Sequence, residues 1–169
     1  MSRFTVVSTG AAGLGGRLWY SVAEYSFGFT VTDGAGLDAR NWSGERSSLS
    51  IGTLQVEVDP PSGTVLFVWG LHPHLRWVEG QCEPDRLVSG IVRARVANGF
   101  LAGAATGIAE VGEWRTTWDP VSGWVRVAPP GEARGEVQVL VASQTALGIS
   151  RRGLSSVWLH PEFESGVQP

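Results

Sequence analysis

The sequence predicts a single all-β domain, either an antiparallel β-barrel or a β-sandwich of about eight to ten short strands, with little helix. Three observations support this fold class. Apolar and polar residues alternate in several short runs, glycine and proline interrupt these runs frequently, and convincing helical patterns are scarce. With 169 residues, the chain has the length of one domain. We assign residues 1–163 to this domain and residues 164–169 to a flexible C-terminal tail.

The alternation is clearest in four segments, namely residues 26–32, 54–59, 86–97 and 136–141. A period of two places one apolar set on a single face of a half-buried strand. Residues 64–69 (TVLFVW) are mostly apolar at both parities, so we expect this run at the centre of a sheet, buried on both faces.

The breaks between the runs have the chemistry of tight turns. Asn-Gly at 98–99 suits a two-residue hairpin, because both central residues of a type I′ turn need positive φ. Asp-Gly at 33–34 is a weaker example of the same signal. DPPSG at 59–63 and DPVSG at 119–123 each combine an early proline with a late glycine, which is typical of β-turns.

Those two proline-containing turns belong to a longer internal similarity. Residues 51–67 align with residues 111–127, and most of the identical positions fall in the turn. A duplicated hairpin and shared turn chemistry both explain this pattern, and the sequence leaves the two explanations open.

Composition restricts the function and the cellular location. Hydrophobic residues make up 43% of the chain and charged residues 17%, which suits a folded core without disulfide or metal support. The formal net charge is −3 and basic residues form no run, so we expect no nucleic-acid partner. All basic side chains apart from histidine are arginine, which excludes Schiff-base and P-loop lysine chemistry. We expect a soluble, cytoplasmic protein with no membrane partner, because we find neither a signal peptide nor a long apolar stretch.

A glycine-rich segment follows the first predicted strand. Its sequence, TGAAGLGG at 9–16, has the spacing TGxxGxxG and resembles the nucleotide-binding loop of extended short-chain dehydrogenases. The resemblance implies a dinucleotide, with Asp33 in the place of the acid that binds the ribose. However, residues 37–100 lack the helices that a Rossmann sheet requires, and the family's Tyr-x-x-x-Lys motif needs a lysine. We therefore interpret the segment as a connection between strands and expect no cofactor.

A second motif contains two of the three histidines. His72 and His74, followed by Glu79, resemble the first metal motif of cupins, and His160 could supply a third imidazole. This resemblance implies a divalent metal ion held by a facial set of ligands. Pro73 between the histidines disrupts the strand geometry that cupins use. A surface loop without metal is therefore the preferred interpretation.

Tryptophan is the residue type most in excess, with eight in the chain. Trp118 and Trp124 flank the second proline-containing turn, so we expect them to face each other across a hairpin. Trp114 and Arg126 fall on the same predicted face, and Trp69 ends the central apolar run. We predict that these five residues line a ligand-binding cavity. The alternative is that Trp114 and Trp118 are ordinary core residues.

The predicted function is binding of an apolar or aromatic small molecule inside the β-domain, and this could extend to cyclase- or isomerase-like chemistry without metal or cofactor. Two alternatives stay open, because a fold does not fix a function. One is a non-catalytic structural protein that self-assembles into oligomers or joins a multiprotein particle. The other is a carbohydrate-binding module. Cys82, the only cysteine, is interpreted as a structural or incidental thiol.

Overall fold

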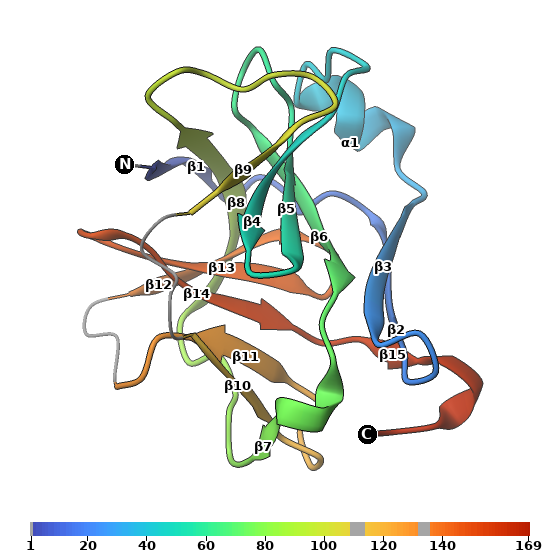
Figure 1. Cartoon of the computed structure of the whole chain (residues 1–169). Coiled ribbons are helices and arrows are strands. Elements are labelled where there is room, and N and C mark those ends of the chain that lie inside the picture. Colours follow the sequence, from blue (N-terminus) through green and yellow to red (C-terminus); the bar gives the residue numbers. More distant parts are fainter. Residues whose placement is uncertain (1, 109–113, 132–135) are drawn as a thin grey trace.

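The computed structural model describes residues 2–108, 114–131 and 136–169, which form two facing β-sheets (Figure 1). An eight-stranded sheet has the order β1-β8-β12-β13-β14-β11-β10-β7, and a seven-stranded sheet has the order β15-β2-β3-β6-β5-β4-β9. The strands are β1 (Arg3–Thr9), β2 (Gly16–Ser21), β3 (Ser26–Val31), β4 (Ser47–Ile51), β5 (Leu54–Val58), β6 (Val65–Leu71), β7 (Val78–Glu79), β8 (Leu87–Arg95), β9 (Ala105–Gly107), β10 (Arg115–Trp118), β11 (Val125–Ala128), β12 (Val137–Ala142), β13 (Thr145–Ser150), β14 (Gly153–Leu159) and β15 (Glu162–Phe163).

The β class and the low helix content are confirmed, while the finer prediction needs correction. Across the described ranges the helical elements are α1 (Gly34–Ala39) and the short turns η1 (His74–Arg76) and η2 (Glu164–Gly166). The two sheets fit a sandwich, and within those ranges neither sheet closes into a barrel. The described residues form 15 strands, more than the eight to ten predicted, and three of them (β7, β9 and β15) are edge strands too short to show any alternation. Most neighbours are antiparallel, but the pair β8–β12 and all three of these short edge strands run parallel to their neighbours.

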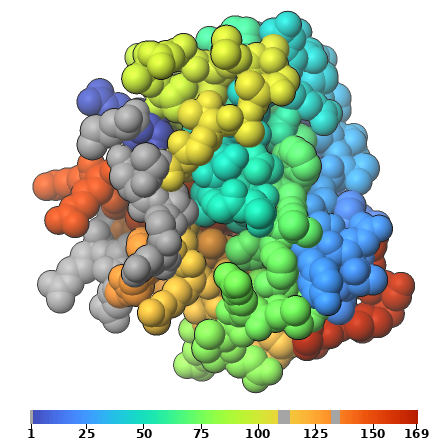
Figure 2. Space-filling model, in the orientation of Figure 1, coloured from blue at the N-terminus to red at the C-terminus, as the bar shows by residue number. Residues whose placement is uncertain are grey.

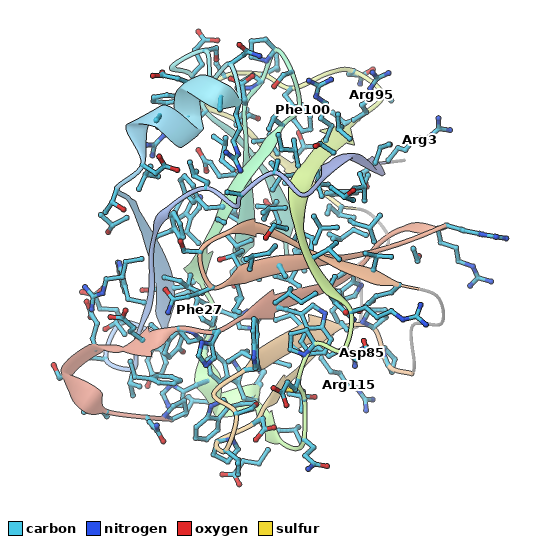
Figure 3. All side chains as sticks on the ribbon, turned by 180° about the vertical axis from the view of Figure 1, so that it is seen from behind. Arg3, Phe27, Asp85, Arg95, Phe100 and Arg115 are labelled. Carbon is cyan, nitrogen blue, oxygen red and sulfur yellow. The ribbon has the colours of Figure 1, made fainter. Side chains whose placement is uncertain are left out.

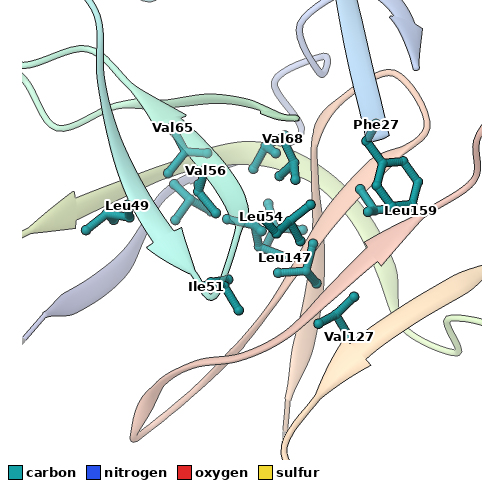
Figure 4. Close-up of a cluster of buried hydrophobic side chains, with 14 of the residues drawn as sticks. Phe27, Leu49, Ile51, Leu54, Val56, Val65, Val68, Val127, Leu147 and Leu159 are labelled. Carbon is teal, nitrogen blue, oxygen red and sulfur yellow. The ribbon is translucent and has the colours of Figure 1, made fainter. Parts of the chain in front are cut away.

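The main core lies between the sheets (Figure 4). The predicted alternation in residues 54–59 is confirmed, since Leu54, Val56 and Val58 are fully buried there. Val139 and Leu147 face them from the opposite sheet within the same cluster. Burying each such side chain contributes roughly 1.5–3 kcal/mol, so the interface between the sheets is the main source of stability.

The two proline-containing turns adopt the same hydrogen-bonding pattern in different sheets. The N–H of Gly63 donates to Asp59 O at 2.7 Å in the β5–β6 turn, and the N–H of Gly123 donates to Asp119 O at 2.8 Å in the β10–β11 turn. Both glycines have positive φ, as the turn predictions required. The first three residues of the aligned segment 111–127 lie outside the described residues.

The dipeptides Asn-Gly at 98–99 and Asp-Gly at 33–34 do not form the two-residue hairpin turns that the sequence predicts. Gly99 has positive φ and donates its N–H to Val96 O at 3.1 Å, but the chain then crosses from β8 to β9 in the other sheet. The hairpin predicted at 98–99 is therefore wrong, although the turn is present. Asp33 caps α1 by accepting the N–H of Gly36 at 2.8 Å, so 33–34 opens a helix and does not close a hairpin.

The glycine-rich segment 9–16 connects two strands, as expected. It leads from β1 into β2, and not into a helix whose N-terminus could hold a pyrophosphate. The Asp33 carboxylate accepts backbone N–H bonds from Gly36 and from Gly15, which lower its pKa. Within the described residues this acid is therefore occupied in supporting the backbone.

Candidate functional site

A cavity of about 560 Å³ lies where three distant segments meet. These segments are the β4–β5 turn, the connection from β6 through η1 to β7, and strand β10. Figure 2 shows the face on which they gather, with the turn in teal, the connection in green and β10 in gold. The lining residues are Ile51, Gly52, Thr53, His72, Pro73, Arg76, Trp77, Val78, Trp114, Arg115, Thr116 and Val127.

Trp77 is the best-anchored ring of the cavity wall. Its ring stacks on Phe27 with centroids 5.7 Å apart and lies 4.8 Å from Tyr20 and 5.9 Å from His72. The Tyr20 hydroxyl donates to His72 O at 2.8 Å, which ties the connection to β2. Among the described residues the buried Trp77 Nε1 has no acceptor, so this donor is unused. The wall is therefore preorganised by aromatic packing.

His72 is the titratable residue most strongly affected by this environment. Its Nε2 lies 2.7 Å from Thr116 Oγ1, and the direction of donation depends on the imidazole tautomer. Burial lowers the His72 pKa from 6.5 to about 4. The imidazole is therefore neutral at physiological pH and offers the cavity a polar group without charge.

The charged residues of the lining are basic. Arg76 and Arg115 are both exposed, whereas no aspartate or glutamate is found among the described lining residues. Because opposite charges at a rim favour association, the cavity suits a neutral or anionic ligand better than a cation.

The predicted tryptophan cluster is separated by the strand register. Trp118 pairs with Val125 across the hairpin and lies in the main core with 6% of its surface exposed. Trp124 pairs instead with Asp119, whose N–H donates to Trp124 O at 2.9 Å. This one-residue offset puts the two rings on opposite faces of the sheet, so the prediction that they face each other is wrong.

The other residues predicted to line one cavity, namely Trp114, Arg126 and Trp69, also lie apart from one another. Trp114 lies in the lining of the cavity. Arg126 does share the face of Trp124, but its guanidinium lies 5.3 Å from the centre of the Trp158 ring, on the outer side of the sheet. Trp69 points to the outer face of the seven-stranded sheet, with 42% of its surface exposed, and does not line the cavity.

The alternative metal set is not assembled. The His72 Nε2 contacts Thr116, whereas the His160 Nε2 lies 3.0 Å from Ser122 O and its ring packs 5.0 Å from Trp124. His74 stacks on Tyr25, and Glu79 is exposed on β7. Within residues 2–108, 114–131 and 136–169, no group of three histidine, cysteine or acidic side chains could hold a metal ion.

Sequence reasoning missed much of the cavity. Trp77 was visible as one of eight tryptophans, and its place between the histidine motif and β7 carried no periodic signal. Thr53, Arg76 and Thr116 are ordinary residue types with no motif around them. The parallel pairing of β7 with β10, where Thr117 lies opposite Val78, brings the segments of Arg76 and Thr116 together.

No protein-family model matches this chain, and no curated protein is significantly similar to it in sequence. Among the described residues, no helix has both the length and the apolar character needed to span a bilayer.

Proposed function

We propose that this protein binds a planar, aromatic small molecule that carries a carboxylate or another hydrogen-bond acceptor, in the cavity between β4–β5, η1 and β10. The observation that carries the proposal is the combination of two tryptophans, Trp77 and Trp114, with a basic rim and no acid among the described lining residues. A volume of about 560 Å³ lies within the usual range for small-molecule sites. The indole rings offer stacking surface, and Thr53 and Thr116 offer polar contacts.

Binding is better supported than catalysis. Isomerisation or cyclisation usually needs a group that moves a proton near neutral pH. Among the described lining residues, His72 is the only side chain suited to that task, and a pKa of about 4 makes it a weak base. The cavity therefore has the shape and donors of a binding site, and turnover of the ligand is not part of the proposal.

The test is a calorimetric titration with benzoate and indole acetate, compared with benzyl alcohol and indole. We expect the carboxylates to bind more tightly than the uncharged analogues. Trp114→Ala should weaken binding of all four compounds, and Arg76→Ala should weaken binding of the carboxylates only, each by about tenfold. Arg95→Ala is the matched control, because Arg95 lies opposite Arg3 at the other end of the molecule from Arg115 (Figure 3).

Two results would contradict the proposal. If none of the four compounds binds, the self-assembling structural protein becomes the better explanation. If Arg95→Ala reduces carboxylate binding as much as Arg76→Ala, the effect comes from net charge and not from the cavity.

A further inference from the structure

The outer face of the seven-stranded sheet carries a second aromatic surface, separate from the cavity. Trp19 on β2 lies opposite Gly28 on β3, and Trp69 on β6 lies opposite Gln55 on β5. The pairing of Phe27 with Gly70 continues this register between β3 and β6. Since the Phe27 side chain points into the core, its neighbour Gly28 faces outward. The two tryptophans therefore belong to one row across four strands, with Gly28 between them and Gln55 beyond Trp69.

The Trp19 ring lies flat on the sheet. A Cβ built on Gly28 would overlap the six-membered part of the Trp19 indole, so only glycine leaves room for the ring there. One face of the indole thus rests on the β3 backbone, and the opposite face is directed away from the sheet. Trp19 is only half-buried, in keeping with this orientation.

The Trp69 ring is held by a buried acid. Its Nε1 donates to Glu57 Oε2 at 2.6 Å, and Glu57 is only 3% exposed. Burial raises the Glu57 pKa, while the Trp69 hydrogen bond and the charge of Arg46, 4.0 Å away, act in the opposite direction. A buried carboxylate costs stability. Here it fixes the indole plane, although 42% of Trp69 is still exposed.

Polar side chains continue the row beyond Trp69. Gln55 Oε1 accepts from the hydroxyls of Ser48 and Ser50 at 2.8 and 3.0 Å, so its orientation is fixed. Its amide nitrogen makes one long bond of 3.3 Å to Thr53 O, which leaves donor capacity toward solvent. The row therefore combines two preoriented ring planes with adjacent hydroxyl and amide groups.

We propose that this row, defined by Trp19, Gly28, Trp69, Gln55 and Ser50, binds a neutral oligosaccharide. A sugar ring has an apolar C–H face that stacks on an indole and hydroxyls around its edge that pair with amide and hydroxyl groups. β2 and β6 lie two strand spacings apart, roughly 10 Å, so adjacent sugar units reach both rings. Single-stranded nucleic acid also stacks on aromatic rings, but it requires a basic groove. Here the charged residue held against Trp69 is an acid, and the net charge of the chain is −3.

The test is affinity electrophoresis in gels that contain soluble starch, hydroxyethyl cellulose or xylan. We expect at least one polysaccharide to retard the protein, and we expect Trp69→Ala and Trp19→Ala each to weaken this binding by at least about tenfold. Leu87→Ala is the matched control, because Leu87 is 41% exposed on the other sheet and its loss should leave retardation unchanged. Trp69→Ala removes a side chain that is 42% exposed but also leaves the buried Glu57 without its indole donor, so circular dichroism is used to verify that both tryptophan variants are folded before the gels are compared.

Glu57 provides a separate readout as a positioning residue. Glu57→Gln keeps an acceptor for the Trp69 indole and should retain most of the binding, whereas Glu57→Leu should lose it and also shift the tryptophan fluorescence. The proposal is overturned if no gel retards the protein, if Trp69→Ala and Leu87→Ala behave alike, or if labelled oligothymidylate binds and the polysaccharides do not. None of these outcomes depends on the aromatic carboxylates, so the cavity proposal stands or fails independently.

Discussion

Replacing Trp118 by alanine should destabilise the protein strongly. Only 6% of Trp118 is exposed, and its ring belongs to the main cluster between the sheets, next to Phe163 at 6.2 Å. Deleting a large aromatic side chain from a packed core costs about 3–5 kcal/mol. For a chain of 169 residues, each kcal/mol corresponds to about 2–4 °C in Tm. We therefore expect Tm to fall by about 6–20 °C.

A second substitution, Trp118→Phe, measures the contribution of the apolar ring separately from that of the indole N–H. Among the described residues, the buried Trp118 Nε1 has no acceptor, and an unsatisfied buried donor costs about 1–3 kcal/mol. Trp118→Phe removes that donor and keeps most of the apolar surface, so we expect a loss below about 1.5 kcal/mol. Urea unfolding followed by far-UV circular dichroism measures both variants. If Trp118→Ala costs less than about 1 kcal/mol, or if Trp118→Phe costs as much as Trp118→Ala, the placement of Trp118 in the core is refuted.

Three further predictions concern titratable groups. Because the His72 pKa is lowered to about 4, the unfolded chain takes up a proton below pH 6.5 and the folded protein does not. Stability should thus fall by roughly 3 kcal/mol between pH 6.5 and pH 4, and His72→Gln should remove this loss in urea titrations at several pH values. Asp59 accepts bonds from the N–H and hydroxyl of Ser43, so Asp59→Ala should cost roughly 1.5–3 kcal/mol by the same assay; an unchanged midpoint would refute this. Burial and then the nearby Asp119 carboxylate raise the Cys82 pKa to about 11, so iodoacetamide should label Cys82 at pH 7 only after unfolding.

The confirmed part of the fold prediction, the β class with its strands and turns, follows from patterns that are local in the sequence. Leu54, Val56 and Val58 alternate because one face of β5 packs against the opposite sheet, and this pattern is visible in any half-buried strand. The turns at 59–63 and 119–123 were predictable for the same reason, since their proline and glycine set the backbone locally. The choice between a barrel and a sandwich was not predictable, because it depends on which edge strands pair across the chain.

The tryptophan cluster shows where local patterns stop being sufficient. The alternation of residues along the sequence correctly placed Trp114 and Trp118 on one face of the segment 114–118. It also correctly placed Trp124 and Arg126 on one face of the segment 124–126. The relation between these two pairs depends on the register across the turn, and a shift of one residue moves every side chain to the other face. The cavity is harder still, because Thr53, Trp77 and Trp114 come from segments that meet only in the folded chain.

The position of β15 has a consequence for the order of assembly. This strand pairs in parallel with β2, so that Glu162 lies opposite Trp19 and forms an ion pair with Arg17 at 2.6 Å. More than 100 residues separate the β2–β3 hairpin from β15 in the sequence, so a growing chain lacks this pairing until those residues have been added. Release of β15 from the folded protein would expose the backbone groups of β2 at Trp19 and Tyr20, which are then free to pair with another strand.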